Sequence, residues 1–258
     1  MLDRETIKKN YLEYVDNYEQ SGRVTLKRTH ILRVADRASE LATNLNLTPE
    51  QIELAYVIGI CHDIGRFEQV KRYNTFSDKK TEMDHAAWSV KVLFEDNLIR
   101  SFIDTDKYDE LIKVAVLNHN KTMIDESLTG DELLFSKIIR DADKLDILYV
   151  ITSNRIKDIF WYDDFGDKMI KKKLILDFYA KKYLDYGEVD TNMDQIVTFY
   201  SYIYDFNFKE SLKIIKENNY YDTFNKRVKL MNSSKLLHEQ LDNLLNSLKK
   251  YIEIKESE

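Results

Sequence analysis

Proline and glycine, the residues that most often interrupt helices, are scarce in this chain. One proline and six glycines occur in 258 residues. Strand-and-turn architectures use both residues at their turns, so this scarcity favours long helices. Apolar residues recur at three- and four-residue steps, and no alternating segment of useful length is visible. We therefore predict an all-α protein.

Composition places the chain among globular proteins. Hydrophobic residues make up 43% and charged residues 33%, enough for a sizeable core. No run approaches eighteen apolar residues, and the first ten residues are polar, so we expect neither a membrane span nor a signal peptide. The net charge of -6 argues against an extended nucleic-acid surface but leaves room for a small phosphorylated ligand.

The single cysteine, Cys61, excludes an internal disulfide and fits a reducing, cytoplasmic compartment. Adjacent residues on a helix point about 100° apart, so Cys61 and His62 are not expected to face one ion. We predict a buried thiol at Cys61.

Helix signals run through the chain without a linker, repeat or low-complexity break. Thr48 is predicted to cap a helix that contains Pro49 and to form a capping box with Gln51. That helix is expected to run to about Asp63, with Gly65 able to end it. The remaining helices are predicted over 4–20 and 25–45, from Asp84, Thr105 and Asp131, and over 167–186, 190–206, 209–229 and 233–256. The stretch 66–83 reads as polar and irregular.

Four of the five histidines form a series with acidic residues: His30, His62-Asp63, His85, His119 and Asp143. Each lies in, or at the end of, the inward row of a predicted helix. A lone histidine of this kind is usually a core residue, but a whole series on separate helices predicts a metal site. Imidazole nitrogens and carboxylate oxygens together suit Mn, Fe, Ni or Zn. The fifth, His238, has no acid at ligand spacing and is predicted to be a packing or surface residue.

Three acids compete for the last position of the series. Asp141 shares its helical row with Lys137 and is expected to face solvent. Asp143 continues the row of Ile139 and is expected to point inward. Asp146 lies one turn further on and could orient a histidine. We choose Asp143.

These residues resemble the HD superfamily of metal-dependent phosphohydrolases. Cys-His-Asp-Ile-Gly-Arg at 61–66 is similar to that family's central signature, and Arg-Asp-Ala-Asp-Lys-Leu-Asp at 140–146 to its closing segment. The resemblance implies an HD-domain helical bundle over about 25–150, followed by additional C-terminal helices over about 155–258. We expect both parts to form a single all-helical domain, 1–258.

The same resemblance implies a set of metal ligands. His30, His62, Asp63 and Asp143 would hold one ion, and Asp63 would bridge to a second ion held by His85 and His119. One or two divalent ions are expected as cofactor, drawn from Mn, Fe, Mg, Ni or Zn.

Two branches of the family differ from this chain. The Gly-Tyr-Pro segment of the cyclic-dinucleotide phosphodiesterases is missing, and Asn120 follows His119 where that branch has a second histidine. The extended His-Asp motif of the guanosine tetraphosphate hydrolases is also absent. Neither activity is expected.

The predicted function is hydrolysis of a small phosphorylated metabolite or nucleotide by metal-activated water. Asp63, Arg66 and Lys144 are the predicted catalytic residues; Lys144 resembles a phosphate-contacting lysine of nucleotide-cleaving relatives. Arg66, Lys121, Lys144 and Arg72 are predicted to bind the substrate, although a solvated surface cation is the simpler interpretation of Arg72.

Two other functions stay open. A few relatives with the same six ligands hold a di-iron centre and oxidise C–H or C–P bonds with oxygen. A non-catalytic, ligand-sensing module could instead keep a structural ion. The C-terminal third is expected to pack on the first part or to supply a surface for a homo-oligomer.

Overall fold

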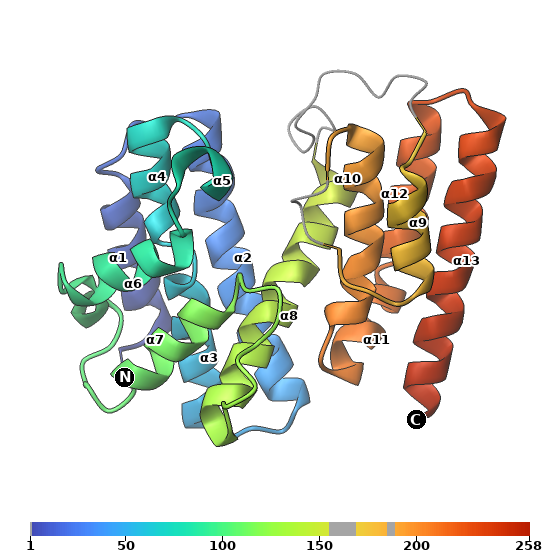
Figure 1. Ribbon diagram of the computed structural model, residues 1–258. Helices are drawn as coiled ribbons and strands as arrows, with labels where there is room; N and C mark the ends of the chain where they lie inside the picture. Colours follow the sequence, from blue (N-terminus) through green and yellow to red (C-terminus); the bar gives the residue numbers. More distant parts are fainter. Residues whose placement is uncertain (1, 155–168, 185–188) are drawn as a thin grey trace. The chain divides into compact units, whose positions relative to one another are not determined.

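The computed structural model describes residues 2–154, 169–184 and 189–258 (Figure 1). Throughout these residues the regular structure is helical, with no strand, which confirms the all-α prediction. The chain divides into two compact units, Met1–Asp146 and Ile147–Glu258. The prediction of one continuous domain stays a prediction. No helix in the described ranges has both the length and the apolar character needed to cross a membrane.

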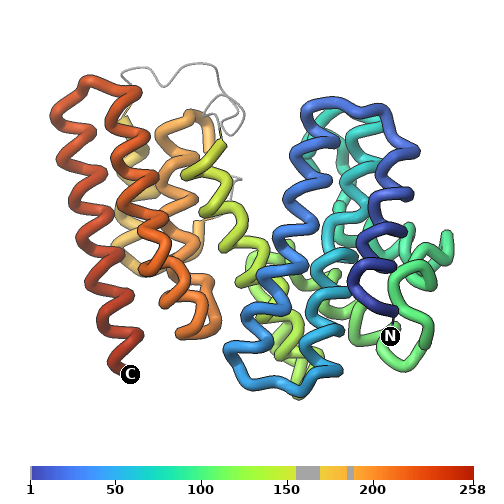
Figure 2. The backbone as a smooth tube through the Cα atoms, turned by 180° about the vertical axis from the view of Figure 1, so that it is seen from behind, coloured from blue at the N-terminus to red at the C-terminus, as the bar shows by residue number. Residues whose placement is uncertain are grey.

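The first unit is built from short and medium helices around one core. They are α1 (Arg4–Val15), α2 (Gly22–Asn44), α3 (Pro49–Cys61), α4 (Gly65–Tyr73), α5 (Asp78–Thr81), α6 (His85–Phe94), the 3₁₀ helix η1 (Leu98–Ser101), α7 (Asp109–Asn118) and the first part of α8 (Gly130–Ser153). In Figure 2 the blue tubes of α2 and α3 run side by side.

The predicted helix starts are confirmed where a capping side chain is present. Thr48 accepts from the backbone of Gln51, whose side chain in turn accepts from Thr48, so the capping box at α3 is complete. Asp84 accepts from Ala86 and Ala87 and begins α6. Both caps bond backbone N–H groups that the first helical turn leaves unpaired.

The prediction of an irregular stretch over 66–83 is wrong for most of its length, because α4 covers residues 66–73 of it and α5 covers residues 78–81. The aromatic ring of Phe67 explains α4: its centroid lies 5.5 Å from that of Tyr18 and 6.2 Å from that of Tyr14. A helix of nine residues has too few turns to show a clear period in the sequence. Gly65, expected to end a helix, instead begins α4.

Two glycines allow backbones to approach closely beside the histidine series. A Cβ on Gly59 would lie 2.4 Å from Cα of Ala35, so α3 contacts the backbone of α2 there. A Cβ on Gly65 would lie 2.5 Å from the backbone nitrogen of Ser89 on α6. The His62-Asp63 turn lies between these two glycines and is therefore held close to both α2 and α6.

The second unit has an aromatic core. Its described helices are the remainder of α8, α9 (Lys172–Tyr179), α10 (Asn192–Ser201), η4 (Tyr202–Asp205), α11 (Lys209–Glu217), α12 (Tyr220–Leu230) and α13 (Lys235–Ser257). Tyr200 stacks on Tyr221, with ring centroids 5.8 Å apart. The helix predicted over 209–229 is two helices, because Asn219 adopts a left-handed conformation at φ 51° between them. The prediction over 167–186 lies partly outside the described residues. His238 bonds the carbonyl of Asn232, as expected of a packing residue.

Candidate metal centre

All four histidines of the series are buried, and each has its Nδ1 bonded to an oxygen. The partners are Asp146 Oδ2 for His30 at 2.7 Å, the Gly59 carbonyl for His62 at 2.7 Å, Asp78 Oδ2 for His85 at 2.5 Å and the Val116 carbonyl for His119 at 2.6 Å. Carbonyl and carboxylate oxygens accept hydrogen bonds, so each Nδ1 is assigned the proton. For His62, His85 and His119 this leaves Nε2 with a lone pair, whereas Nε2 of His30 lies 3.1 Å from Oδ1 of Asp143 and can carry a second proton while no cation is bound.

The first ligand group consists of His30, His62 and Asp143. Nε2 of His30 lies 3.1 Å from Oδ1 of Asp143, and Nε2 of His62 lies 3.8 Å from the same oxygen. Oδ2 of Asp63 lies 3.7 Å from Nε2 of His30 and 3.6 Å from Nε2 of His62. Residues from α2, the end of α3 and α8 therefore meet at one point.

The second ligand group consists of Asp63, His85 and His119. The Nε2 atoms of His85 and His119 lie 3.1 Å apart. Oδ1 of Asp63 lies 3.4 Å from the first of these nitrogens and 3.6 Å from the second. Because the other oxygen of Asp63 faces the first ligand group, this carboxylate lies between the two groups.

The separations between the donor atoms suit ligands placed around a cation better than they suit hydrogen bonds between the donors. Nitrogen and oxygen ligands about 2.1 Å from an ion, at angles of about 90–110°, lie about 3.0–3.4 Å apart. The separations within the two groups run from 3.1 to 3.8 Å, at or slightly above this range. Nε2 of His62 and Oδ1 of Asp63 are buried and have no hydrogen bond. A buried polar atom without a partner is costly, and a bound cation would remove that cost.

The protonation states agree with this interpretation. Burial lowers the pKa of His62 to about 3, and burial together with Arg66 lowers the pKa of His85 to about 4. The His85 ring is therefore uncharged at neutral pH. Burial acts to raise the pKa of Asp63, but Lys27 and His62 outweigh it and hold that pKa well below its usual value. The pKa of Asp143 is also lowered, because the bond to His30 outweighs burial. The same bond and the bond to Asp146 raise the pKa of His30 against burial and Lys27, so a cation bound there would replace a proton on that ring.

A scan against protein-family models identifies the part of the chain that carries these groups. The HD domain model matches residues 28–148. Residues 28–148 form an HD domain. HD domains belong to a superfamily of metal-dependent hydrolases whose members bind divalent ions. No curated protein and no solved structure matches the chain.

The closing segment of the HD domain differs from expectation at one of its acids. Asp141 was expected to face solvent but is fully buried, because α8 is enclosed on every side there and residues 138–142 are all buried. Asp146 accepts from His30 and also from Nε of Arg33 at 2.6 Å, which confirms its orienting position. Arg140 donates to the carbonyl of Asn118 at 3.0 Å and to that of Lys121, and so holds the loop around His119.

The predicted substrate cations occupy different environments. Nε of Arg66 lies 3.5 Å from Oδ1 of Asp63, and Lys144 is buried beside Asp143 on α8. Lys121 donates to Oδ2 of Asp84 at 2.6 Å, beside the start of α6. Arg72 pairs with Glu68 and lies over the ring of Trp88, 4.4 Å from its centroid. Arg66 contacts the ligand set directly, whereas Lys121 and Arg72 contact side chains outside that set.

Lys27 is a cation of the centre that the sequence analysis missed. Its ammonium donates to Oδ2 of Asp63, and it lies 5.6 Å from the ring centroid of Phe76. Its side chain is 16% exposed, so it is nearly as enclosed as Arg66. Lys27 lies one helical turn before His30, and that spacing was the signal available in the sequence.

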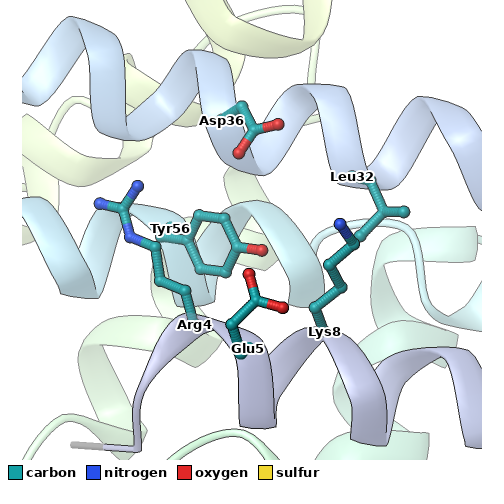
Figure 3. Close-up of a pocket in the computed structure, with 6 residues that line it drawn as sticks. All are labelled: Arg4, Glu5, Lys8, Leu32, Asp36 and Tyr56. Atoms are coloured by element: carbon teal, nitrogen blue, oxygen red, sulfur yellow. The ribbon is translucent and has the colours of Figure 1, made fainter.

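A separate hollow of about 140 Å³ lies on the first unit (Figure 3). It is lined from α1, α2 and α3 by Arg4, Glu5, Lys8, Leu32, Asp36 and Tyr56. Arg4 is held there by two hydrogen bonds to Glu53 and lies 4.8 Å from the ring centroid of Tyr56. None of the metal-ligand candidates lines this hollow.

Proposed function

We propose that the HD domain hydrolyses a phosphoester bond of a small phosphorylated metabolite or nucleotide, using one or two divalent cations. One observation carries the proposal. Four imidazole Nε2 atoms and the carboxylates of Asp63 and Asp143 converge in a buried space, where Nε2 of His62 and Oδ1 of Asp63 have no hydrogen-bond partner. Such an arrangement is costly unless cations occupy it.

The ligand roles follow from the two groups. His30, His62 and Asp143, with Oδ2 of Asp63, would hold the first cation; His85 and His119, with Oδ1 of Asp63, would hold the second. Mixed nitrogen and oxygen donors favour Mn, Fe, Ni or Zn over Mg, which prefers oxygen ligands. Bound cations would lower the pKa of a coordinated water and neutralise charge on the phosphoryl oxygens.

The chain's own cations would bind the substrate's negative charge. Lys27 and Arg66 flank Asp63 from opposite oxygens, so an anion that replaces part of their contact with Asp63 would meet both. Lys144 is a third candidate because it is buried next to Asp143. Lys121 and Arg72 would first have to leave Asp84 and Glu68, which makes them weaker candidates.

The expected partner is small. The donors lie deep in the HD domain, with His62 fully buried and Asp63 3% exposed, which suits a compact phosphoryl group better than a polymer backbone. The net charge of -6 is likewise unfavourable to extended nucleic acid. We propose a cytoplasmic protein that acts on a diffusible metabolite.

The test uses the full chain, first analysed for metal content and then assayed against phosphomonoesters and phosphodiesters with Mn, Mg, Ni and Fe. We expect metal-dependent phosphate release that Asp63→Ala abolishes. Asp36→Asn is the matched control, because Asp36 is an exposed carboxylate of α2 outside the centre. A metal-loaded protein that binds phosphorylated ligands without turnover would contradict hydrolysis and favour the sensor. Oxygen uptake by an iron form, with no phosphate released, would favour the oxygenase.

A further inference from the structure

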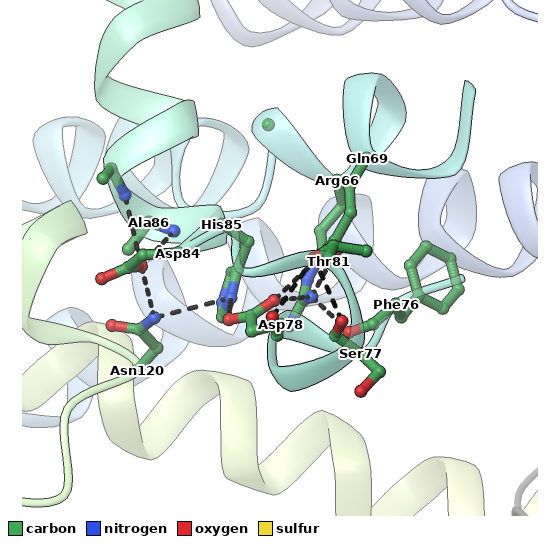
Figure 4. A network of polar contacts seen from close by, with 12 residues as sticks. Arg66, Gln69, Phe76, Ser77, Asp78, Thr81, Asp84, His85, Ala86 and Asn120 are labelled. Carbon is green, nitrogen blue, oxygen red and sulfur yellow. Dashed lines mark hydrogen bonds and ion pairs between the residues drawn. The ribbon is translucent and has the colours of Figure 1, made fainter. Parts of the chain in front are cut away.

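Asp78, on the short helix α5, uses both of its carboxylate oxygens within one network (Figure 4). Oδ2 accepts from Nδ1 of His85 at 2.5 Å. Oδ1 accepts from Nη1 of Arg66 at 2.7 Å and from Nε2 of Gln69 at 2.9 Å. One carboxylate therefore holds a candidate metal ligand and a candidate substrate cation.

The network fixes Arg66 in a definite position. Besides Asp78, Nη1 of Arg66 donates to Oε1 of Gln69 and to the carbonyl of Phe76, both at 2.6 Å. Gln69 is fully buried and is itself anchored to Oγ1 of Thr81 at 3.0 Å. The Nη1 bonds turn Nε of Arg66 toward Asp63, and this Nε is buried without a hydrogen bond.

Asp78 and Asp84 are not free to bind a third ion with His85, although the three residues lie within ligand distance of one another. The Asp78 oxygens are bonded as described above. Asp84 accepts from Asn120 at 2.8 Å and from Lys121 at 2.6 Å, besides capping α6. These bonds tie the start of α6, which carries His85, to the loop that follows His119.

The carboxylates that orient the histidines of the two ligand groups differ in their exposure to solvent. In the first group, Asp146 orients His30 and is only 1% exposed at its side chain. In the second group, Asp78 orients His85 and is 34% exposed. His62 and His119 are oriented by backbone carbonyls instead. Each group thus depends on a different carboxylate, and the one that serves the second group lies nearer to solvent.

We propose that Asp78 is a positioning residue that sets the affinity of the second cation position and, through the same carboxylate, the placement of Arg66. The proposal rests on the proposed function's assignment of two cation positions. Loss of this carboxylate would leave a protein that binds its first cation normally and its second weakly. Orienting partners of this kind typically change metal affinity by about 10- to 100-fold.

The experiment compares Mn²⁺ binding to the full-length wild-type protein and to Asp78→Asn, by calorimetry and by metal analysis after dialysis. Asparagine has one acceptor oxygen and no charge, so it cannot serve both His85 and the Arg66–Gln69 pair. We expect two equivalents in the wild type. In the variant we expect an unchanged first affinity and a second weakened by about 10- to 100-fold.

Two further variants separate positioning from general damage. Thr81→Val removes the anchor of Gln69 without touching His85 or Arg66, and it should leave both affinities within about twofold. Asp146→Asn should show the reverse pattern and weaken the first cation. Thermal unfolding of each metal-free variant identifies any that fail to fold, and Asp78→Glu, which keeps the charge, should recover part of the second affinity.

Equal second affinity in the wild type and Asp78→Asn would overturn the proposal, as would a wild type that binds only one equivalent. Both results are independent of turnover. If two ions bind, and Asp78→Asn weakens the second, but no phosphoester is cleaved, then the proposed hydrolysis fails while the role of Asp78 holds.

Discussion

Gly65 controls how closely the His62-Asp63 turn approaches α6. In Gly65→Ala the new Cβ would lie 2.5 Å from the nitrogen of Ser89, 2.7 Å from the carbonyl carbon of Trp88 and 2.9 Å from the oxygen of His85. All three are backbone atoms of α6, so no side chain can rotate away. Ordinary contact lies near about 3.5 Å, so α4 and α6 must separate by about 1 Å.

This separation has two costs. Overpacking of this kind typically destabilises a protein by about 1–3 kcal/mol, and the better helix propensity of alanine returns at most about 1 kcal/mol. The hydrogen bond from the Gly65 N–H to Oγ of Ser89, now 3.0 Å long, would also be stretched. Asp63 would move away from His85, and the second ligand group would open more than the first.

Urea unfolding of the metal-free protein and Mn²⁺ titration measure these costs separately. We expect Gly65→Ala to lose about 1–2 kcal/mol of unfolding free energy and to bind its second cation more weakly. Gly22→Ala is the control, because nothing lies within 4 Å of a Cβ at that position of α2. It should be neutral or slightly stabilising. Wild-type stability and metal binding in Gly65→Ala would refute the reasoning.

The remaining predictions concern charge. Lys27→Met should weaken binding of inorganic phosphate to the metal-loaded protein by about 10-fold or more, since a hydrogen bond to a charged group is worth about 1.5–3 kcal/mol. Lys8→Met, which lies outside the centre, should leave phosphate binding unchanged. Equal losses of affinity in the two variants would contradict a specific role for Lys27. Removal of metal by a chelator should lower stability by about 2.7 kcal/mol for each cation lost, relative to protein at a free-ion concentration 100 times the Kd of that position, measured as a shift in Tm. Metal-free protein should lose stability as the pH falls below 6. The pKa of His62 is lowered by burial to about 3 and that of His85 to about 4, so the unfolded chain takes up protons there that the native state does not. Burial and Lys27 act to lower the pKa of His30, but Asp143 and Asp146 outweigh them and raise it. The stabilisation from His30 is lost only as the pH rises through that raised pKa, so it does not offset the fall. The free energy of unfolding, measured at pH 7, 6 and 5, should drop by about 1–2 kcal/mol per pH unit, and a flat profile would be inconsistent with neutral buried imidazoles.

The sequence predicted the fold and the convergence of the donors because both leave periodic or discrete signals. Thr48 and Asp84 mark helix starts, and His30 lies in a regular apolar row. The buried thiol of Cys61 is confirmed as well, and burial raises its pKa.

Other parts of the centre leave no such signal. Asp78 lies in a short helix with no measurable period, and its role depends on three partners brought together by the fold. Asp141 was misplaced because pairing it with Lys137 assumed that a row containing lysine faces solvent. Long helices are thus read more reliably than the short segments between them.

The four anchored Nδ1 atoms have a consequence for how the protein acquires metal. The imidazoles are aimed by oxygens of the protein itself, so an arriving ion meets donors that are already aligned and need not organise the chain around it. Loading should therefore be a local exchange in a folded molecule, and ions of similar size and preference should compete for the same places. Which metal the protein carries would then follow the supply around it as much as the identity of its ligands.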